Sequence, residues 1–191
     1  MRKRLIHRSV ALTALAAVAL AACGDEDPAL QTSTPEPATT PGATAELANA
    51  QGQPLGKVTF TERDGKVVVE ANLRGLPPGF HGFHVHAVGK CDAPFTSAGG
   101  HLAVGTQDHP THAGDQPVVL VAADGTAESR FATDRFKLSD LFPPEGRAII
   151  VHASADNYGN VPSRYAPAID KMSKDTGDAG GRLGCGVIRR P

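Results

Sequence analysis

The chain has 191 residues, enough for one domain with a substantial hydrophobic core and too few to require a second. Lysine and arginine number 19 against 20 aspartate and glutamate residues, so there is no basic excess of the kind that binds nucleic acid. Residues 1–22 hold four of the basic side chains and none of the acidic ones, so a chain without them would carry a formal charge of −5. We therefore expect no nucleic-acid partner.

The first 22 residues have the composition of a signal peptide. A basic start precedes the apolar run Ser9–Ala22, which is too short to span a bilayer. The run ends in Leu20-Ala21-Ala22-Cys23, which resembles the lipobox of bacterial lipoproteins, where the cysteine is lipidated. We therefore expect an exported protein, anchored to the extracytoplasmic face of a bacterial membrane through lipid on Cys23. The alternative is an ordinary secretory signal that leaves Cys23 as a thiol.

Residues 23–43 form the next segment. It has no apolar periodicity and contains four prolines among threonine, alanine and glutamate: Pro28, Pro35, Pro37 and Pro41. This composition is typical of a disordered spacer. We therefore divide the chain into a signal peptide (1–22), a lipidated cysteine with its linker (23–43) and a folded domain (44–191).

Short strand patterns begin at residue 44. Residues 57–61 alternate in polarity and are joined to the apolar stretch 67–73 through Asp64-Gly65, which predicts a β-hairpin. Asp124-Gly125 predicts a second hairpin between its flanking apolar runs. Strands are expected at eight places: 44–50, 57–61, 67–73, 81–87, 117–122, 126–132, 147–152 and 186–188. No helix-length amphipathic pattern is present, so we expect an all-β domain, an antiparallel sandwich or flattened barrel.

Two stretches differ from the strands. Residues 88–116 and 153–184 are rich in glycine, aspartate, proline and other polar residues. Loops of this length inside a compact domain are usually functional. We therefore expect these two loops to carry many of the functional residues.

Histidine is concentrated in the part of the chain expected to fold. Seven of the eight histidines follow Cys23. His84-Val85-His86 lies in an expected strand, where residues two apart share a face, so both imidazoles point to one place while Val85 enters the core. One such pair alone is weak support for a metal site. Its weight rises because His101, His109, His112, Asp115 and His152 follow in the first loop and at the end of the strand 147–152.

Imidazole ligands suit copper and zinc, and a set of histidines with one carboxylate favours tetrahedral zinc. Export would permit a disulfide between Cys91 and Cys185, the two cysteines that follow Cys23. Thiolate ligation is excluded if both are oxidised. His81 fits a structural role, with hydrogen bonds to backbone, better than a ligand role.

Five blocks carry a resemblance to a known family: HGFHVHAVGKC, SAGGH, HAGD, IIVHASADN and TGDAGGRLGCGVI. They resemble the signature blocks of the copper-zinc superoxide dismutase family, in that family's order, across nearly all of residues 44–191. The resemblance implies an eight-stranded antiparallel Greek-key barrel with two long functional loops. It also implies an enzyme that dismutates superoxide to dioxygen and hydrogen peroxide with a redox-cycling copper ion.

The resemblance also implies a role for individual residues. Copper would be bound by His84, His86, His101 and His152, and zinc by His101, His109, His112 and Asp115. His101, which would bridge the two ions and carry a proton, and Arg182, beside the substrate channel, would be the catalytic residues. Asp156 would link ligands of both metals through hydrogen bonds. Cys91 and Cys185 would form the family disulfide.

One departure from the family concerns zinc. His109 and His112 are only three residues apart, a shorter interval than the family usually has. A copper-only dismutase is therefore the alternative to a copper-zinc enzyme, and a copper-binding or buffering protein without catalysis is the third interpretation. Lys171 and Lys174 are candidate steering charges for the superoxide anion and are as readily explained as ordinary surface lysines. A monomer and a homodimer both remain open.

Overall fold

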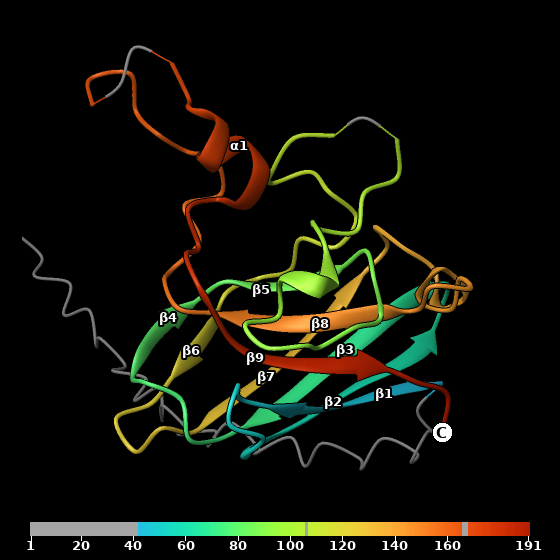
Figure 1. The fold of residues 1–191 in the computed structure, drawn as a ribbon. Helices are drawn as coiled ribbons and strands as arrows, with labels where there is room; N and C mark the ends of the chain where they lie inside the picture. The colour runs from blue at the N-terminus through green and yellow to red at the C-terminus, as the bar shows by residue number, and fades with distance from the viewer. Residues whose placement is uncertain (1–41, 106, 166–167) are drawn as a thin grey trace, which may run out of the picture. The chain divides into compact units, whose positions relative to one another are not determined.

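The computed structural model describes residues 42–105, 107–165 and 168–191, and these residues form strands joined by long connections (Figure 1). The predicted signal peptide, Cys23 and all but the end of the linker lie outside the described residues. The elements in chain order are β1 (Ala43–Ala48), β2 (Pro54–Arg63), β3 (Lys66–Leu73), β4 (Gly79–His81), β5 (Phe83–His86), η1 (Thr96–Ala98), β6 (Val119–Val121), β7 (Ala127–Thr133), η2 (Leu138–Leu141), β8 (Arg147–His152), α1 (Lys171–Thr176) and β9 (Arg182–Ile188).

The strands form two antiparallel sheets. Seven strands pair in the order β5-β8-β9-β1-β2-β3-β7, and β4 pairs with β6. β4 and β5 are one run of chain interrupted at Gly82, whose N–H donates to Ser154 and whose carbonyl accepts from His152. Counted as one strand, this run connects the two sheets and gives the eight expected strands. The connections from β3 to β4 and from β7 to β8 join strands that are not neighbours, as in a Greek key, and β9 pairs with β1.

The two predicted hairpins have different outcomes. β2 and β3 pair throughout, and Asp64 and Gly65 both have positive φ, as the tight turn between them requires. At the second place the Asp124-Gly125 turn forms and Ala122 donates to Thr126. β6 and β7 lie beside each other on the two sides of this turn, while the strand ladders that the structure describes pair β6 with β4 and β7 with β3.

The hydrophobic core fills the interior between the strands. On β1 the alternate residues Ala43, Ala45 and Leu47 are buried, as the two-residue period of a strand requires. β8 is buried on both faces: Ile149 and Val151 join the main core, whereas Ala148 and Ile150 face outward and are covered by the first long loop.

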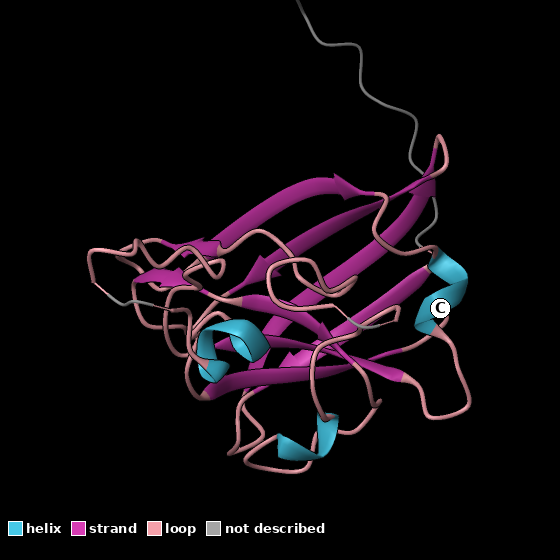
Figure 2. Cartoon of the chain, turned by 90° about the horizontal axis from the view of Figure 1, so that it is seen from above, coloured by secondary structure: helices cyan, strands magenta, loops and turns pink. Residues whose placement is uncertain are grey.

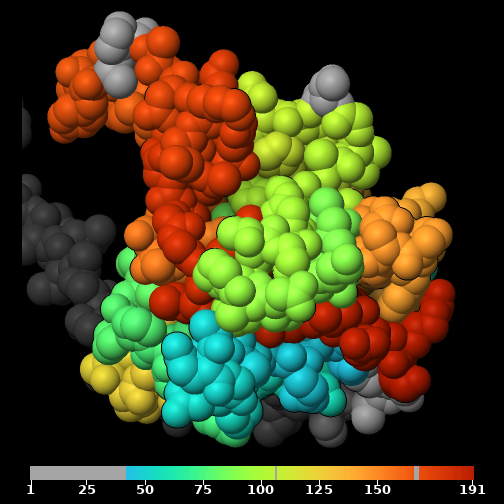
Figure 3. Space-filling view, in the orientation of Figure 1, coloured from blue at the N-terminus to red at the C-terminus, as the bar shows by residue number. Residues whose placement is uncertain are grey.

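The first long loop therefore packs over the outer face of the sheet. Phe95 and Ala98 lie against Ala148 and Ile150 in a second apolar cluster, and Figure 3 shows this loop, in light green, lying over the strands. This contact fixes a loop that has little regular structure of its own.

The second long loop is shorter than expected and contains a helix that the sequence did not predict. β9 begins at Arg182, so residues 182–184 belong to a strand. The six-residue helix α1 is too short for an amphipathic period. It is capped by Asp170, whose side chain accepts from the Ser173 N–H, and by Gly177 in the left-handed conformation. Figure 2 shows the short helices in the connections around the strands. None of the described helices is long and apolar enough to cross a membrane.

Candidate metal centre

Strand β5 places the paired histidines as the two-residue period predicts. Val85 is in the main core, and His84 and His86 are fully buried on the opposite face, beneath the first loop. Single β-bridges join His86 to His101 and His84 to Asp115. The strand and the loop are thus held together at the residues that carry the chemistry.

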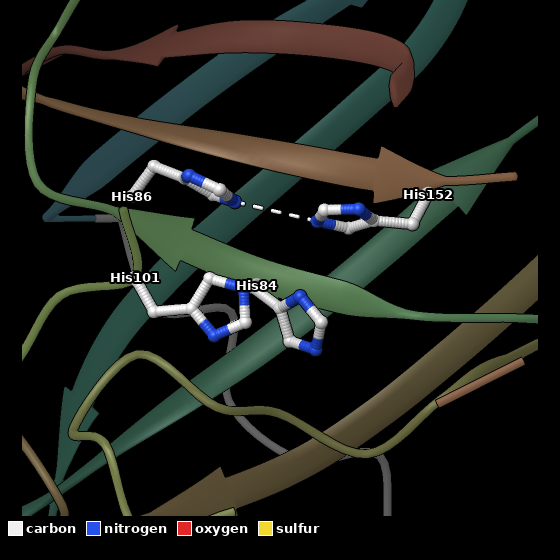
Figure 4. Close-up of side chains that lie close together, drawn as sticks. All are labelled: His84, His86, His101 and His152. Atoms are coloured by element: carbon white, nitrogen blue, oxygen red, sulfur yellow. Dashed lines mark hydrogen bonds between the residues drawn. The ribbon is translucent and has the colours of Figure 1, made fainter. Parts of the chain in front are cut away.

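Four imidazoles converge in what we call the first group: His84, His86, His101 and His152. Each offers one ring nitrogen, and the four nitrogens lie within 4.8 Å of one another. Figure 4 shows the rings turned toward a common centre, with Nε2 of His86 and Nε2 of His152 3.3 Å apart. The group joins β5, the first loop and the end of β8.

The remaining ring nitrogens of the first group are fixed by the protein. Nδ1 of His86 donates to the Gly99 carbonyl at 3.0 Å, and Nδ1 of His152 lies 3.3 Å from the Gly180 carbonyl. Because these Nδ1 atoms carry the proton, the two Nε2 atoms present lone pairs. Two nitrogen lone pairs that face each other do not stabilise the fold, whereas a cation placed between the two Nε2 atoms would bind to both.

A second set of side chains, the second group, surrounds the carboxylate of Asp115. Nδ1 of His101 lies 2.7 Å from Oδ1 of Asp115, and Nδ1 of His109 and of His112 lie 3.1 and 3.2 Å from Oδ2. All four residues are buried. The short interval between His109 and His112 therefore does not keep the four predicted zinc ligands apart.

The two groups meet at His84 and His101. Four atoms from His84, His101, His109 and Asp115 also lie within 4.8 Å of one another, and His112 joins this set through Asp115. Only Nδ1 of His84 remains to bind an ion, because its Nε2 is bonded to Asp156, and we assign it to the first group as the resemblance implies. His101 extends into both groups, with Nδ1 beside Asp115 and Nε2 left for the first group.

Asp156 connects the groups from behind. Its carboxylate accepts from Nε2 of His84 and from Nε2 of His109, each at 2.7 Å, and the Tyr158 N–H donates to the same carboxylate at 2.7 Å. Burial alone would raise the pKa of Asp156, but hydrogen bonds from His109 and His84 hold the pKa well below its usual range. The side chain is thus an anion that orients one imidazole of each group.

Unpartnered atoms test whether these groups fit metal ions. Among the described side chains, buried ring nitrogens without a hydrogen-bond partner include Nδ1 of His84, Nε2 of His101, Nδ1 of His109 and Nδ1 of His112. A buried polar atom without a partner is costly, and native proteins contain few. Here each such nitrogen points into one of the two groups, so the residues fit two metal ions.

Burial also sets the protonation of the imidazoles. It lowers the pKa of His101 to about 4 and that of His152 to about 3, and it lowers the pKa of His86 well below its usual value. For His109, burial acts in the same direction, but the carboxylates of Asp115 and Asp156 outweigh it and raise the pKa to about 9. His86, His101 and His152 are therefore neutral at pH 7, the form in which imidazole binds metal.

Comparison with known proteins agrees with this geometry. The family model for copper/zinc superoxide dismutase (SODC) matches residues 55–188. This chain belongs to that family. "Superoxide dismutase [Cu-Zn]" of Mycolicibacterium paratuberculosis is 38% identical over 172 residues, covering 80% of this chain and 76% of the relative. The protein of the same name from Mycobacterium tuberculosis is 39% identical over 171 residues, covering 78% and 71%.

A solved structure of the family has the same fold. "Cu/Zn superoxide dismutase from Brucella abortus" superposes with a TM-score of 0.63 at 27% identity, covering 77% of this chain and 99% of that one. The predicted copper/zinc superoxide dismutase family and the all-β fold are both confirmed.

Arg182 of this chain lies beside the first group. It is the first residue of β9 and pairs in register with His152. Its guanidinium donates to the Phe95 carbonyl at 2.5 Å and to the Gly99 carbonyl at 2.7 Å. The Gly99 oxygen thus accepts from both Arg182 and His86, which fixes the cation relative to the imidazole. The sequence gives no signal for Gly99, because a backbone carbonyl has no side chain to recognise.

The disulfide predicted from the family resemblance is present. Cys91 and Cys185 are bonded at 2.02 Å and join the first loop to β9. The bond lies in the second apolar cluster beside Phe95, so it holds the part of the loop that carries the acceptors of Arg182.

The other sequence-based interpretations concern residues outside the two groups. Both ring nitrogens of His81 lie 2.8 Å from backbone carbonyls, of His152 and Pro77, which agrees with its structural interpretation. Lys171 forms an ion pair with Asp175, and Lys174 lies 4.0 Å from Asp108. Acidic partners therefore reduce the charge that either lysine presents, and their role in steering stays a prediction.

Proposed function

We propose that the chain dismutates superoxide with a copper ion bound by the first group. The observation that carries this proposal is the convergence of four buried imidazoles, each with one nitrogen directed to a common point. Membership of the family supports the reaction, in which two superoxide anions and two protons give dioxygen and hydrogen peroxide. The chemistry that copper supplies here is one-electron transfer, from one superoxide anion to the next.

Three histidines would hold the ion without taking part in proton transfer. His84, His86 and His152 each have one ring nitrogen bonded to Asp156 or to a backbone carbonyl. The other nitrogen of each is then an acceptor of fixed direction. Their positions on β5 and β8 are set by strand register, so the site needs little rearrangement to bind.

His101 is the residue suited to carrying a proton. Its Nδ1 is bound to Asp115, which leaves Nε2 as the atom that faces the first group. We assign to Nε2 the uptake of a proton and its return to the product anion. Asp115 keeps the ring oriented through this exchange.

The second group supports zinc as the other ion. Three imidazoles and one carboxylate form the closed set that structural zinc prefers. The proximity of all three Nδ1 atoms to Asp115 favours a copper-zinc enzyme over the copper-only alternative. His109 and His112 would act by holding the loop and His101, not by contact with substrate.

Arg182 is the residue we assign to binding the substrate anion. A chain without residues 1–22 has a formal charge of −5, so its overall field repels superoxide. A local cation must offset this repulsion. Arg182 is half-buried and held by two carbonyls, so its charge stays in place while the anion approaches.

We further propose that the protein is exported and anchored through lipid on Cys23. The support comes from the basic and apolar pattern of residues 1–22 and from the lipobox-like Leu20-Ala21-Ala22-Cys23. A disulfide in the folded domain agrees with an oxidising compartment. Mass spectrometry of the protein purified from a bacterial membrane would test it, since an unmodified Cys23 contradicts the anchor.

The proposed activity is tested by metal loading. The full chain would be prepared metal-free, with zinc alone, with copper alone and with both ions, and its consumption of superoxide measured. We expect activity only in the two copper-loaded forms. A protein that binds copper stoichiometrically and consumes no superoxide would instead be a copper-buffering protein.

A further inference from the structure

The short turn between His109 and His112 is shaped mainly by hydrogen bonds among neighbouring residues of the same loop. Thr111 donates to the Asp108 carbonyl through both its N–H and its hydroxyl, at 2.8 and 2.6 Å. The His112 N–H donates to Asp115 at 2.9 Å. These bonds shape the turn, but they do not connect it to the strands of the barrel.

His109 has attachments to the rest of the domain. Its N–H donates to the Lys174 carbonyl at 2.7 Å, and its Nε2 donates to Asp156. The ring of Tyr158 stacks on it with centroids 6.5 Å apart and planes 16° from parallel. The second loop therefore fixes His109, whereas none of these contacts reaches His112.

Arg135 connects the rest of the turn to the barrel. It lies two residues beyond the end of β7, where its N–H donates to the Thr133 hydroxyl at 3.2 Å. Its Nη1 donates to the carbonyls of Pro110 and His112 at 2.6 and 3.4 Å, on either side of Thr111. Hydrogen bonds from a charged donor are stronger than neutral ones. β7 pairs with β3 along its whole length and gives Arg135 a rigid base.

One side of the turn borders an open cleft. This cleft has a volume of about 380 Å³, and its walls include Pro110, Asp115, Phe131, Arg135 and Tyr158. Arg135 and Pro110 of the turn both line this cleft. A turn beside an open hollow depends on specific hydrogen bonds for its position.

We propose that Arg135 is a positioning residue for the second group, holding the short turn so that Nδ1 of His112 stays beside Asp115 for zinc. This inference rests on the proposed zinc site. It assigns to an arginine just beyond β7 the ordering of a turn too short to order itself by packing. Arg135 touches neither the metal ligand atoms nor the substrate, so its effect is on zinc affinity and not on electron transfer.

The test compares Arg135→Met, Arg135→Lys and Arg130→Met in the full chain with copper already bound. Methionine keeps the apolar stem and removes the donors, and lysine restores one charged donor. Arg130 is the matched control, because it lies on β7 and binds Glu70. Zinc affinity would be measured by competition with a chromophoric chelator. Cobalt(II) in place of zinc would report the coordination geometry through its visible spectrum.

We expect Arg135→Met to weaken zinc binding about tenfold, which is the usual loss when a residue that supports the metal ligands is removed. The variant should also alter the cobalt spectrum. Arg135→Lys should recover part of the affinity, and Arg130→Met should match the unmodified chain. Equal zinc affinity in Arg135→Met and the unmodified chain would overturn the inference. If the unmodified chain binds no zinc, the inference fails with the zinc site, while superoxide consumption with copper alone still tests the proposed activity separately.

Discussion

The first and second groups share His101 and differ in how their other members are held. His86 and His152 stand on adjacent, paired strands, and their second ring nitrogens face backbone carbonyls. His109 and His112 stand on a loop and depend on the side chains of Asp156 and Arg135. Strand register thus positions His84, His86 and His152, whereas contacts between loops and with Arg135 position His109 and His112. The second site should therefore be the more sensitive to changes outside its ligands.

The largest effect is expected from removing a ligand that belongs to the first group alone. His152→Ala deletes one of four converging nitrogens and should abolish superoxide consumption while zinc binding persists. Activity and metal content of the same preparation would be measured together. Retained activity at full copper occupancy would remove His152 from the site, and loss of zinc along with copper would show that the groups are not separable.

The pH dependence of the metal-free protein should separate the groups. His101 and His152 have pKa values of about 4 and about 3 in the fold, below the ordinary 6.5, so the unfolded chain binds more protons below pH 6.5. Stability should fall as the pH drops from 6.5 toward 3, by about 3 kcal/mol for His101 alone. His109, with its pKa raised to about 9, contributes stability that is lost as the pH rises from 6.5 through 9.

Urea denaturation of the metal-free chain between pH 4 and 9 would measure both losses of stability, the one on the acid side of pH 6.5 and the one on the alkaline side. We expect greatest stability near pH 6.5. His109→Gln should reduce the loss of stability above pH 6.5 and leave the loss below pH 6.5 unchanged. A profile that is level across this range would contradict the assignment of the acid loss to His101 and His152 and of the alkaline loss to His109.

A change at Arg182 should slow the consumption of superoxide without loss of copper from the first group. Arg182→Glu reverses the charge beside His86 and should slow superoxide consumption about 10- to 100-fold. The rate of the unmodified chain should decline with added salt, and this decline should flatten in the variant. Lys57→Glu is the matched control, because Lys57 lies on β2, outside both long loops, and pairs with Glu46. A variant with an unchanged rate would exclude Arg182 from substrate binding.

The smallest effect is expected at Gly177, which touches the second group from outside. A Cβ at Gly177 would overlap Oδ1 of Asp156 and approach Nε2 of His109. Gly177→Ala should therefore weaken zinc binding about tenfold, with a smaller effect on copper. Gly65→Ala is the control, since Gly65 also has positive φ but has no neighbour near its Cβ position. Equal losses of zinc affinity in both variants would mean that backbone strain alone explains the effect.

Local patterns account for what the sequence could predict of this fold. Asp64-Gly65 identifies a hairpin because a two-residue turn requires positive φ, and His84-Val85-His86 identifies a shared face because strands have a two-residue period. The pairing of β6 with β4 could not be predicted in this way, because a turn signal at Asp124-Gly125 does not name the partner strand.

The site was predictable where side chains carry it and not where the backbone does. The family blocks led to the histidines, Asp115 and Asp156, which the structure brings together. The carbonyls of Gly99 and Gly180 have no sequence signature, since any residue supplies one. Arg135 could not be identified either, because its role depends on how near the end of β7 lies to a turn 23 to 25 residues earlier.

The bond between Cys91 and Cys185 gives the enzyme a dependence on its surroundings. The same stretch of loop supplies the Phe95 and Gly99 oxygens that orient the guanidinium and one imidazole. In a reducing compartment the chain would retain every ligand yet lose the covalent support of the loop that aligns them. Full catalytic competence would therefore require an oxidising environment, in which the bond between Cys91 and Cys185 persists.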